Sequence, residues 1–174
     1  MYDKNSRKLA CAPRCVNSTA RSFLPRPDRD RLLRMTDVKE LLPHRDPFLF
    51  VDRIEKADAE EIIGYRRFTE AEFFFPGHFP TYPIVPGVIL IETLAQCGGA
   101  GARMISDKPG LFFLAAVEKA KFRRQVKPGE EVRLVIKNLR LSKSTVRQAG
   151  KAYVGDELAA EAEWLALIGD GTPS

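Results

Sequence analysis

The stretch "PGVILIETLAQCGGAGARMIS" at residues 86–106 decides the fold, because it is the longest apolar segment of the chain. Pro86 suits the first turn of a helix, where its missing N–H is not needed. The residues after it are apolar around most of the helix circumference, so this helix must be buried. Glu92, Gln96 and Arg103 interrupt a run already near the ~20-residue minimum for a membrane span. The segment therefore predicts a long core helix and no membrane span.

Strand patterns surround this helix. A short helix is expected at 36–43, followed by strands at 48–58 and 60–69. Downstream, apolar and polar residues alternate in five β-type segments, at 111–118, 121–126, 130–143, 144–155 and 157–169. One long buried helix followed by strands long enough to curl around it is an α+β layout, with the helix wrapped by an antiparallel sheet.

The chain divides into a basic extension at 1–34 and one domain at 35–170. The extension holds nine Lys and Arg but three Asp, whereas the remainder is close to neutral, which disfavours a nucleic-acid-binding domain. We expect the extension to be disordered. Three interpretations of the extension are open: a start site placed too early, a dispensable tail, or an organelle transit peptide. The first is suggested by Met35, after which the helix and strand patterns begin. Cys11 and Cys15 have no second pair or nearby His, so no metal site is predicted.

Two titratable residues stand out near the start of the long helix. His78 lies in "FFFPGHFPTYPIVPGV" (73–88), whose prolines predict a rigid loop, and Glu92 follows in the second helical turn. An unpaired ionised carboxylate costs several kcal/mol to bury. Each residue alone also has a purely structural interpretation, as a hydrogen-bonded side chain. Together with the free N–H groups at the helix start, they suit proton abstraction next to a carbonyl and enolate stabilisation.

Three stretches resemble the β-hydroxyacyl-acyl carrier protein dehydratases of type II fatty acid synthesis, in the FabZ branch of the hot-dog fold. They are "LLPHRDPFLFVDRI" (41–54), "FFFPGHFPTYPIVPGVILIETLAQ" (73–96) and "FLAAVEKAKFRRQVKPGEEV" (113–132). The resemblance covers nearly all of 36–168. It implies a hot-dog fold and the reversible loss of water from a (3R)-3-hydroxyacyl thioester, which gives the trans-2-enoyl thioester.

The resemblance also implies roles for residues. His78 and Glu92 correspond to the catalytic pair, contributed by two different protomers. The N–H of Gly87 would bind the thioester carbonyl oxygen. Gln96, one helical turn after Glu92, is expected to hydrogen-bond the carboxyl or the released water. No metal or organic cofactor is implied, and His44 is set aside because its motif is a structural N-terminal element in the family.

Other assignments concern the substrate and its carrier. Phenylalanines beside His78 are expected to line an acyl tunnel, or else to be core: Phe74, Phe75 and Phe79. A basic cluster is expected to dock acidic acyl carrier protein, which carries the acyl chain on a phosphopantetheine arm, or else to be a solvated strand face. Its members are Lys121, Arg123, Arg124 and Lys127. We expect a cytoplasmic homodimer, and by resemblance a trimer of dimers.

Three alternatives remain open. A dehydratase that also isomerises the double bond typically has Asp at the position of Glu92. A hot-dog thioesterase generally lacks the Gly-His-Phe-Pro sequence and needs an activated water near the carbonyl. A non-catalytic hot-dog subunit could bind acyl carrier protein without turnover, although retention of both His78 and Glu92 argues against this.

Overall fold

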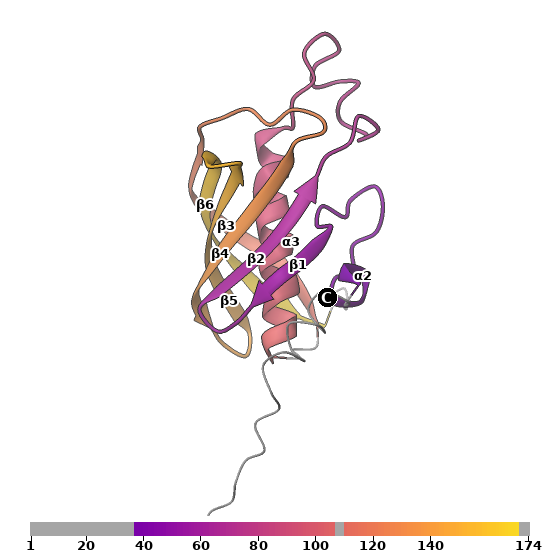
Figure 1. The fold of residues 1–174 in the computed structure, drawn as a ribbon. Coiled ribbons are helices and arrows are strands. Elements are labelled where there is room, and N and C mark those ends of the chain that lie inside the picture. The colour runs from indigo at the N-terminus through magenta and orange to yellow at the C-terminus, as the bar shows by residue number, and fades with distance from the viewer. Residues whose placement is uncertain (1–36, 107–109, 171–174) are drawn as a thin grey trace, which may run out of the picture.

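A computed structural model describes residues 37–106 and 110–170. In this part of the chain, a six-stranded antiparallel sheet curls around one long helix, α3 (Gly87–Ser106), as Figure 1 shows. This is the hot-dog arrangement expected from the sequence. The predicted extension at 1–34 and its two cysteines lie outside the described residues.

The sheet has the order β1-β2-β4-β5-β6-β3, so β1 and β3 are its edges. The strands of the sheet are β1 (Arg53–Ala57), β2 (Glu61–Arg67), β3 (Leu111–Phe122), β4 (Glu131–Leu141), β5 (Thr145–Val154) and β6 (Glu157–Gly169). Alternate residues of β4 and β5 are buried, which is the pattern of strands with one face on a core. The alternation of apolar and polar residues in the sequence of these strands results from this burial of one face.

Strand β3 corrects the prediction of two separate strands at 111–118 and 121–126. It is one strand of 12 residues that pairs with β6, and its register shifts between Glu118 and Lys121. Lys119 has φ 52°, in the left-handed region that non-glycine residues seldom adopt. A local bulge therefore lies where the two segments were expected to separate, and the strand continues through it to Phe122.

Helix α3 contacts all six strands and forms the centre of the core. By length and composition it could cross a membrane, but two thirds of that stretch is buried inside the domain, as in the core helix of a soluble protein. Close packing requires glycine on its sheet-facing side. A Cβ atom on Gly101 would come within 2.5 Å of the Ile62 side chain on β2. The Ile62 side chain of the sheet thus packs directly against the helix backbone at Gly101.

Two further segments adjoin α3: the short helix α2 packs on it, and the proline-rich loop leads into it. The short helix α2 (Val38–Leu41) is capped by Asp37, whose carboxylate accepts from the N–H of Lys39. The proline-rich loop before α3, at the top of Figure 1, is joined to the loop after β3. Val85 N–H donates to the carbonyl of Val126, and the Tyr82 hydroxyl donates to Gln125.

Candidate active site

His78 is held in the proline-rich loop by bonds that fix its ring. Its backbone N–H donates to the carbonyl of Phe74, and Nδ1 lies 3.0 Å from the carbonyl oxygen of Ile84. Because a carbonyl only accepts, Nδ1 must carry the proton of that bond. The neutral ring then has its lone pair on Nε2, the form a general base requires. The ring also stacks on Phe79, with centroids 4.2 Å apart.

Gly87 is the first residue of α3, so its N–H has no carbonyl one turn earlier in the helix to bind. It lines a surface cavity of about 660 Å³ together with His78 and Phe122. The ring of Phe122, at the end of β3, lies directly against Gly87. His78 and Gly87, whose N–H is bound by no other residue in the described part of the chain, therefore line one cavity.

Glu92 lies in a second cavity, of about 190 Å³, where it is half-buried. Its Oε1 accepts from Nε2 of Gln96 at 2.9 Å. Gln96 is itself buried, and its other bonds are to the backbone at Phe48 and Phe50. The carboxyl is one of the two partners expected for Gln96, and its part in the reaction stays a prediction. Apolar residues, including Phe112 and Trp164, form much of the remaining wall.

Within one chain, His78 and Glu92 line different cavities.

The sequence analysis missed two residues that contact the predicted site residues Glu92 and Gly87. His44 was set aside, yet its Nε2 lies 3.7 Å from Oε1 of Glu92. Phe122 carries no signal in the sequence that would relate it to Gly87, because it is separated from that residue by most of α3 and β3.

The three phenylalanines predicted to line a tunnel differ in burial. Phe74 and Phe75 belong to the hydrophobic core, where their rings pack edge-to-face at 4.7 Å. Phe79 is exposed. None of the three is among the residues that line the cavities of His78 and Glu92. The tunnel assignment therefore stays a prediction for these residues.

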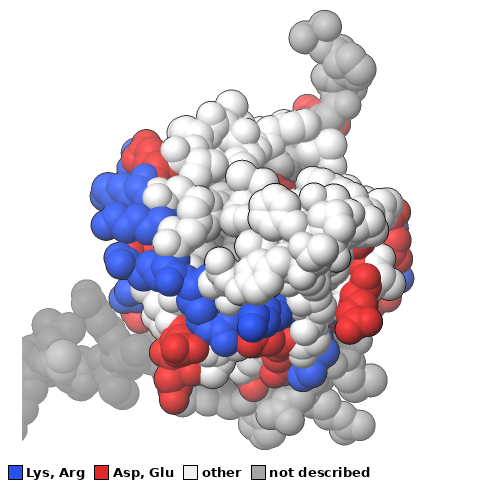
Figure 2. Space-filling view, turned by 90° about the horizontal axis from the view of Figure 1, so that it is seen from above, with Lys and Arg blue, Asp and Glu red and all other residues white. Residues whose placement is uncertain are grey.

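The predicted basic cluster is partly paired within the chain. Arg124 binds the carboxylates of Glu130 and Glu157, and these bonds raise the pKa of its guanidinium above its ordinary value. Arg123 binds the carboxylate of Glu161 at 2.7 Å. Figure 2 shows Lys and Arg side chains gathered on one side of the end of the molecule that carries the proline-rich loop, next to a surface free of charged side chains. A basic rim thus adjoins an uncharged surface.

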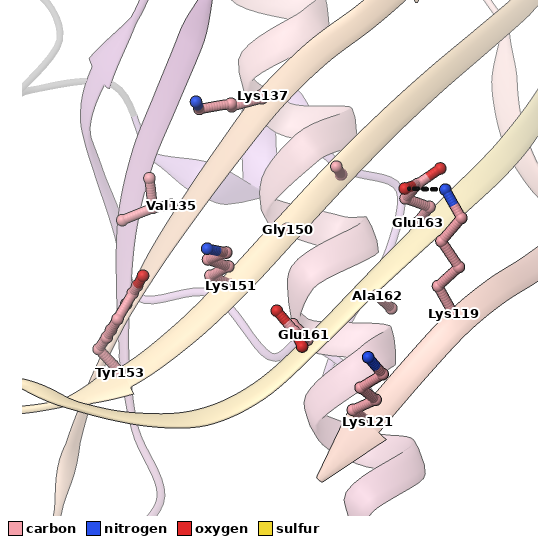
Figure 3. Close-up of a pocket in the computed structure, with 11 residues that line it drawn as sticks. Lys119, Lys121, Val135, Lys137, Gly150, Lys151, Tyr153, Glu161, Ala162 and Glu163 are labelled. Atoms are coloured by element: carbon pink, nitrogen blue, oxygen red, sulfur yellow. Dashed lines mark hydrogen bonds and ion pairs between the residues drawn. The ribbon is translucent and has the colours of Figure 1, made fainter. Parts of the chain in front are cut away.

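Lys121 faces away from the helix, into a groove on the outer side of the sheet (Figure 3). The groove also holds Lys119, Lys137 and Lys151, drawn from three further positions on β3, β4 and β5. Lys119 is paired with Glu163 at 2.7 Å. The basic surface thereby extends from the end of β3 onto the outer sheet face.

One family model matches most of the chain. The family model described as a FabA-like domain matches residues 42–163. The 3-hydroxyacyl-[acyl-carrier-protein] dehydratase FabZ of Desulforamulus reducens is 44% identical over 140 residues, covering 79% of this chain and 99% of the relative. FabZ of Syntrophobacter fumaroxidans is 47% identical over 131 residues, covering 74% of this chain and 88% of the relative.

A solved structure supports the fold. The dehydratase heterocomplex ApeI:P from Xenorhabdus doucetiae has a TM-score of 0.67 at 14% identity, covering 79% of this chain and 94% of the other. A thioesterase superfamily member from Mus musculus has a TM-score of 0.52 at 14% identity, covering 67% and 80%. These likenesses show a shared hot-dog fold, and the family match and the sequence identities show that the chain belongs to the FabZ-type 3-hydroxyacyl-[acyl-carrier-protein] dehydratases.

Proposed function

We propose that this enzyme catalyses the reversible dehydration of (3R)-3-hydroxyacyl-acyl carrier protein to the trans-2-enoyl product in fatty acid biosynthesis. The observation that carries the proposal is the hydrogen bond of His78 Nδ1 to the Ile84 carbonyl. His78 shares its cavity with Gly87, whose N–H has no partner among residues 37–106 and 110–170. A base whose accepting nitrogen is fixed and an N–H donor in the same cavity suit proton removal next to a carbonyl.

Each group has one role in the reaction. His78 Nε2 removes the α proton, and the Gly87 N–H binds the thioester oxygen as negative charge develops on it. Glu92 delivers a proton to the departing hydroxyl, which leaves as water. Gln96 holds the Glu92 carboxyl through its bond to Oε1. These steps use side chains and backbone alone, and no cofactor takes part.

The active site is proposed to be shared by two protomers that pair along β3. This strand is a sheet edge in the described chain, and it exposes apolar side chains. They are Phe113, Leu114, Val117 and Phe122, at 47%, 42%, 43% and 55% exposure. A long edge strand with exposed apolar side chains is open to pairing with a second copy. A C2 dimer buries this edge, and three such dimers form the proposed hexamer.

Antiparallel pairing of two β3 strands explains why one chain separates His78 from Glu92. The Glu92 cavity is lined by residues near the start of β3, such as Phe112 and Leu114, whereas the His78 cavity is lined by Phe122 at its end. In an antiparallel pair, the start of one strand lies beside the end of the other. The His78 cavity of one chain then adjoins the Glu92 cavity of its partner.

The substrate is proposed to arrive on acidic acyl carrier protein in the cytoplasm. The basic side chains at the end of β3 and on the outer sheet face adjoin the His78 cavity, which includes Arg123 and Arg124. Opposite charges on two surfaces speed and orient their encounter. Since Arg124 is already paired with two carboxylates, Lys121 and Lys127 are the more available docking charges.

The decisive experiment is hydration of crotonyl thioesters, on acyl carrier protein and on a pantetheine mimic. It compares the wild type with His78→Ala and Glu92→Gln. We expect an active wild type and losses of about 10²–10⁴-fold in both variants, the range for removal of acid–base groups. An inactive wild type that still binds acyl carrier protein would support the non-catalytic alternative. Release of free thiol without hydration would support the thioesterase alternative.

A further inference from the structure

The carboxyl group of Glu92 faces two side-chain nitrogens. Nε2 of Gln96 donates to Oε1 at 2.9 Å, and Nε2 of His44 lies 3.7 Å from the same oxygen. His44 follows α2 and lines the cavity of Glu92. Hydrogen bonds of a catalytic group are often long without substrate and shorten when it binds. His44 is therefore placed to act on Glu92.

The surroundings of the His44 ring favour one tautomer. Its Nδ1 is buried and has no hydrogen-bond partner among residues 37–106 and 110–170. A proton on Nδ1 would be a buried donor without an acceptor, which is unfavourable. A proton on Nε2 instead points at the Glu92 carboxyl. Neutral His44 is thus an Nε2–H donor, the opposite of His78, whose Nδ1 carries the proton.

The orientation of the Gln96 amide is also determined by its partners. The backbone N–H of Phe50 donates to Oε1 of Gln96 at 2.8 Å, so the oxygen must lie on that side. Nε2 then faces Glu92 and the carbonyl of Phe48. Both donors, from His44 and Gln96, consequently converge on Oε1 of Glu92.

The backbone of His44 is fixed independently of its ring. The guanidinium of Arg45 donates to the carbonyls of Leu42 and His44 at 2.8 and 2.7 Å. Arg45 therefore holds the peptide rather than the imidazole. Glu92 is the charged side chain that the structure gives as a partner of the His44 ring.

We propose that His44 is a positioning residue for Glu92. Together, His44 and Gln96 donate N–H bonds to Oε1 of Glu92, so that the proton to be transferred lies on the other oxygen, Oε2. This rests on the dehydration proposed above. As the α C–H bond breaks, its proton goes to His78 and its electrons form the C=C bond. The C–O bond breaks, and the hydroxyl takes the proton from Oε2 to leave as water. The two N–H donors on Oε1 stabilise the Glu92 carboxylate that results.

The kinetic test uses three substitutions at one position. His44→Phe keeps a ring without a donor, His44→Gln places an amide nitrogen near the position of Nε2, and His44→Asn carries the same amide on a shorter chain. With crotonyl-acyl carrier protein, we expect His44→Phe and His44→Asn to lower kcat by roughly 10–100-fold, with KM within about threefold of wild type. His44→Gln should recover most of kcat. Wild-type kcat in His44→Phe, or equal losses in the Gln and Asn variants, would overturn the proposal.

A second test does not depend on turnover. The chain has two histidines, so protein labelled with ¹⁵N-histidine shows two imidazoles. Long-range ¹H–¹⁵N spectra at neutral pH should show the proton on Nε2 in His44 and on Nδ1 in His78. Glu92→Gln should shift the His44 Nε2 signal. An Nδ1–H tautomer of His44, or a signal unaffected by Glu92→Gln, would refute the contact.

The two tests separate the two proposals. A wild type without hydratase activity removes the proposed function, while the spectra still decide whether His44 donates to Glu92. An active wild type with unaffected His44 variants removes the positioning role alone.

Discussion

The ring of Phe122 lies so close to Gly87 that a Cβ atom on Gly87 would come within 2.7 Å of its Cε1 atom. Gly87 begins α3, and Phe122 ends β3, the edge strand proposed to join two protomers. The start of α3 therefore has room for a hydrogen but not for a methyl group. This contact links the position of the Gly87 N–H to the geometry of the edge strand.

Gly87→Ala should lower kcat by about 10²-fold, because the added methyl displaces either Phe122 or the helix start, and loss of one oxyanion donor costs ~10²–10³ in rate. The measurement is the rate of crotonyl thioester hydration, with thermal unfolding to verify folding.

Phe122→Leu provides the matched test of that mechanism. The smaller side chain removes the ring that the methyl group would meet, so Gly87→Ala combined with Phe122→Leu should lose less activity than the product of the single effects predicts. Purely multiplicative losses would mean that Gly87 is required for a reason other than this contact.

Substitution of two glycines on α3 by alanine should change the free energy of unfolding in opposite directions. Gly101→Ala places a methyl 2.5 Å from the Ile62 side chain and should lower the free energy of unfolding by about 1–3 kcal/mol through overpacking. Gly99→Ala meets its nearest neighbour, Leu42, at 3.8 Å, so it should raise stability by about 0.5–1 kcal/mol through helix propensity. Denaturant unfolding of both variants tests this, and equal effects would contradict the close packing of Gly101.

The long helix could be predicted from sequence because its apolar residues cover one continuous segment, and the structure begins it at Gly87, one residue after Pro86. The strands after it followed from their alternation. The division of this region into separate segments at 111–118 and 121–126 was wrong, because β3 runs continuously through residues 119 and 120. Lys119, which has a positive φ, lies at the register shift between Glu118 and Lys121, and β3 pairs with β6 on both sides of it.

The candidate site was predictable only in part. His78, Glu92 and Gln96 lie in one contiguous stretch, so a motif can reveal them. His44 meets Glu92 because the segment after α2 packs on α3, where Gln96 binds the backbone at Phe48 and Phe50. Such a contact joins residues far apart in sequence, and a single chain's pattern contains no signal of it.

The loop after β3 provides a prediction for pH dependence. Glu130 accepts two bonds from the Arg124 guanidinium and one from the N–H of Lys127, and the Arg124 bonds are the main cause of its lowered pKa. A carboxyl whose pKa is depressed by folding stabilises the fold above its ordinary pKa of 4.5, and this contribution is lost as pH falls through the depressed value.

Glu130→Gln should therefore lower the free energy of unfolding by about 1 kcal/mol at neutral pH, and the difference from wild type should shrink as the solution is acidified. Urea unfolding across this pH range measures it. Glu157→Gln is the control, because Glu157 binds the same arginine with a side chain that is 72% exposed, and it should have little effect. A difference for Glu130→Gln that is independent of pH would exclude the ion pair as its cause.

Mixing inactive variants tests the shared active site directly. If each site takes His78 from one chain and Glu92 from the other, a heterodimer of His78→Ala and Glu92→Gln chains has one site with both substitutions and one with neither. Random exchange of equal amounts should then restore about one quarter of wild-type activity, since half of the dimers are mixed and each has one of two sites intact. Subunits exchanged by reversible unfolding, with each variant treated alone as a control, provide the measurement. Continued inactivity after verified exchange would mean that both groups act within one chain, and the separate cavities would then have to join by a rearrangement within the protomer.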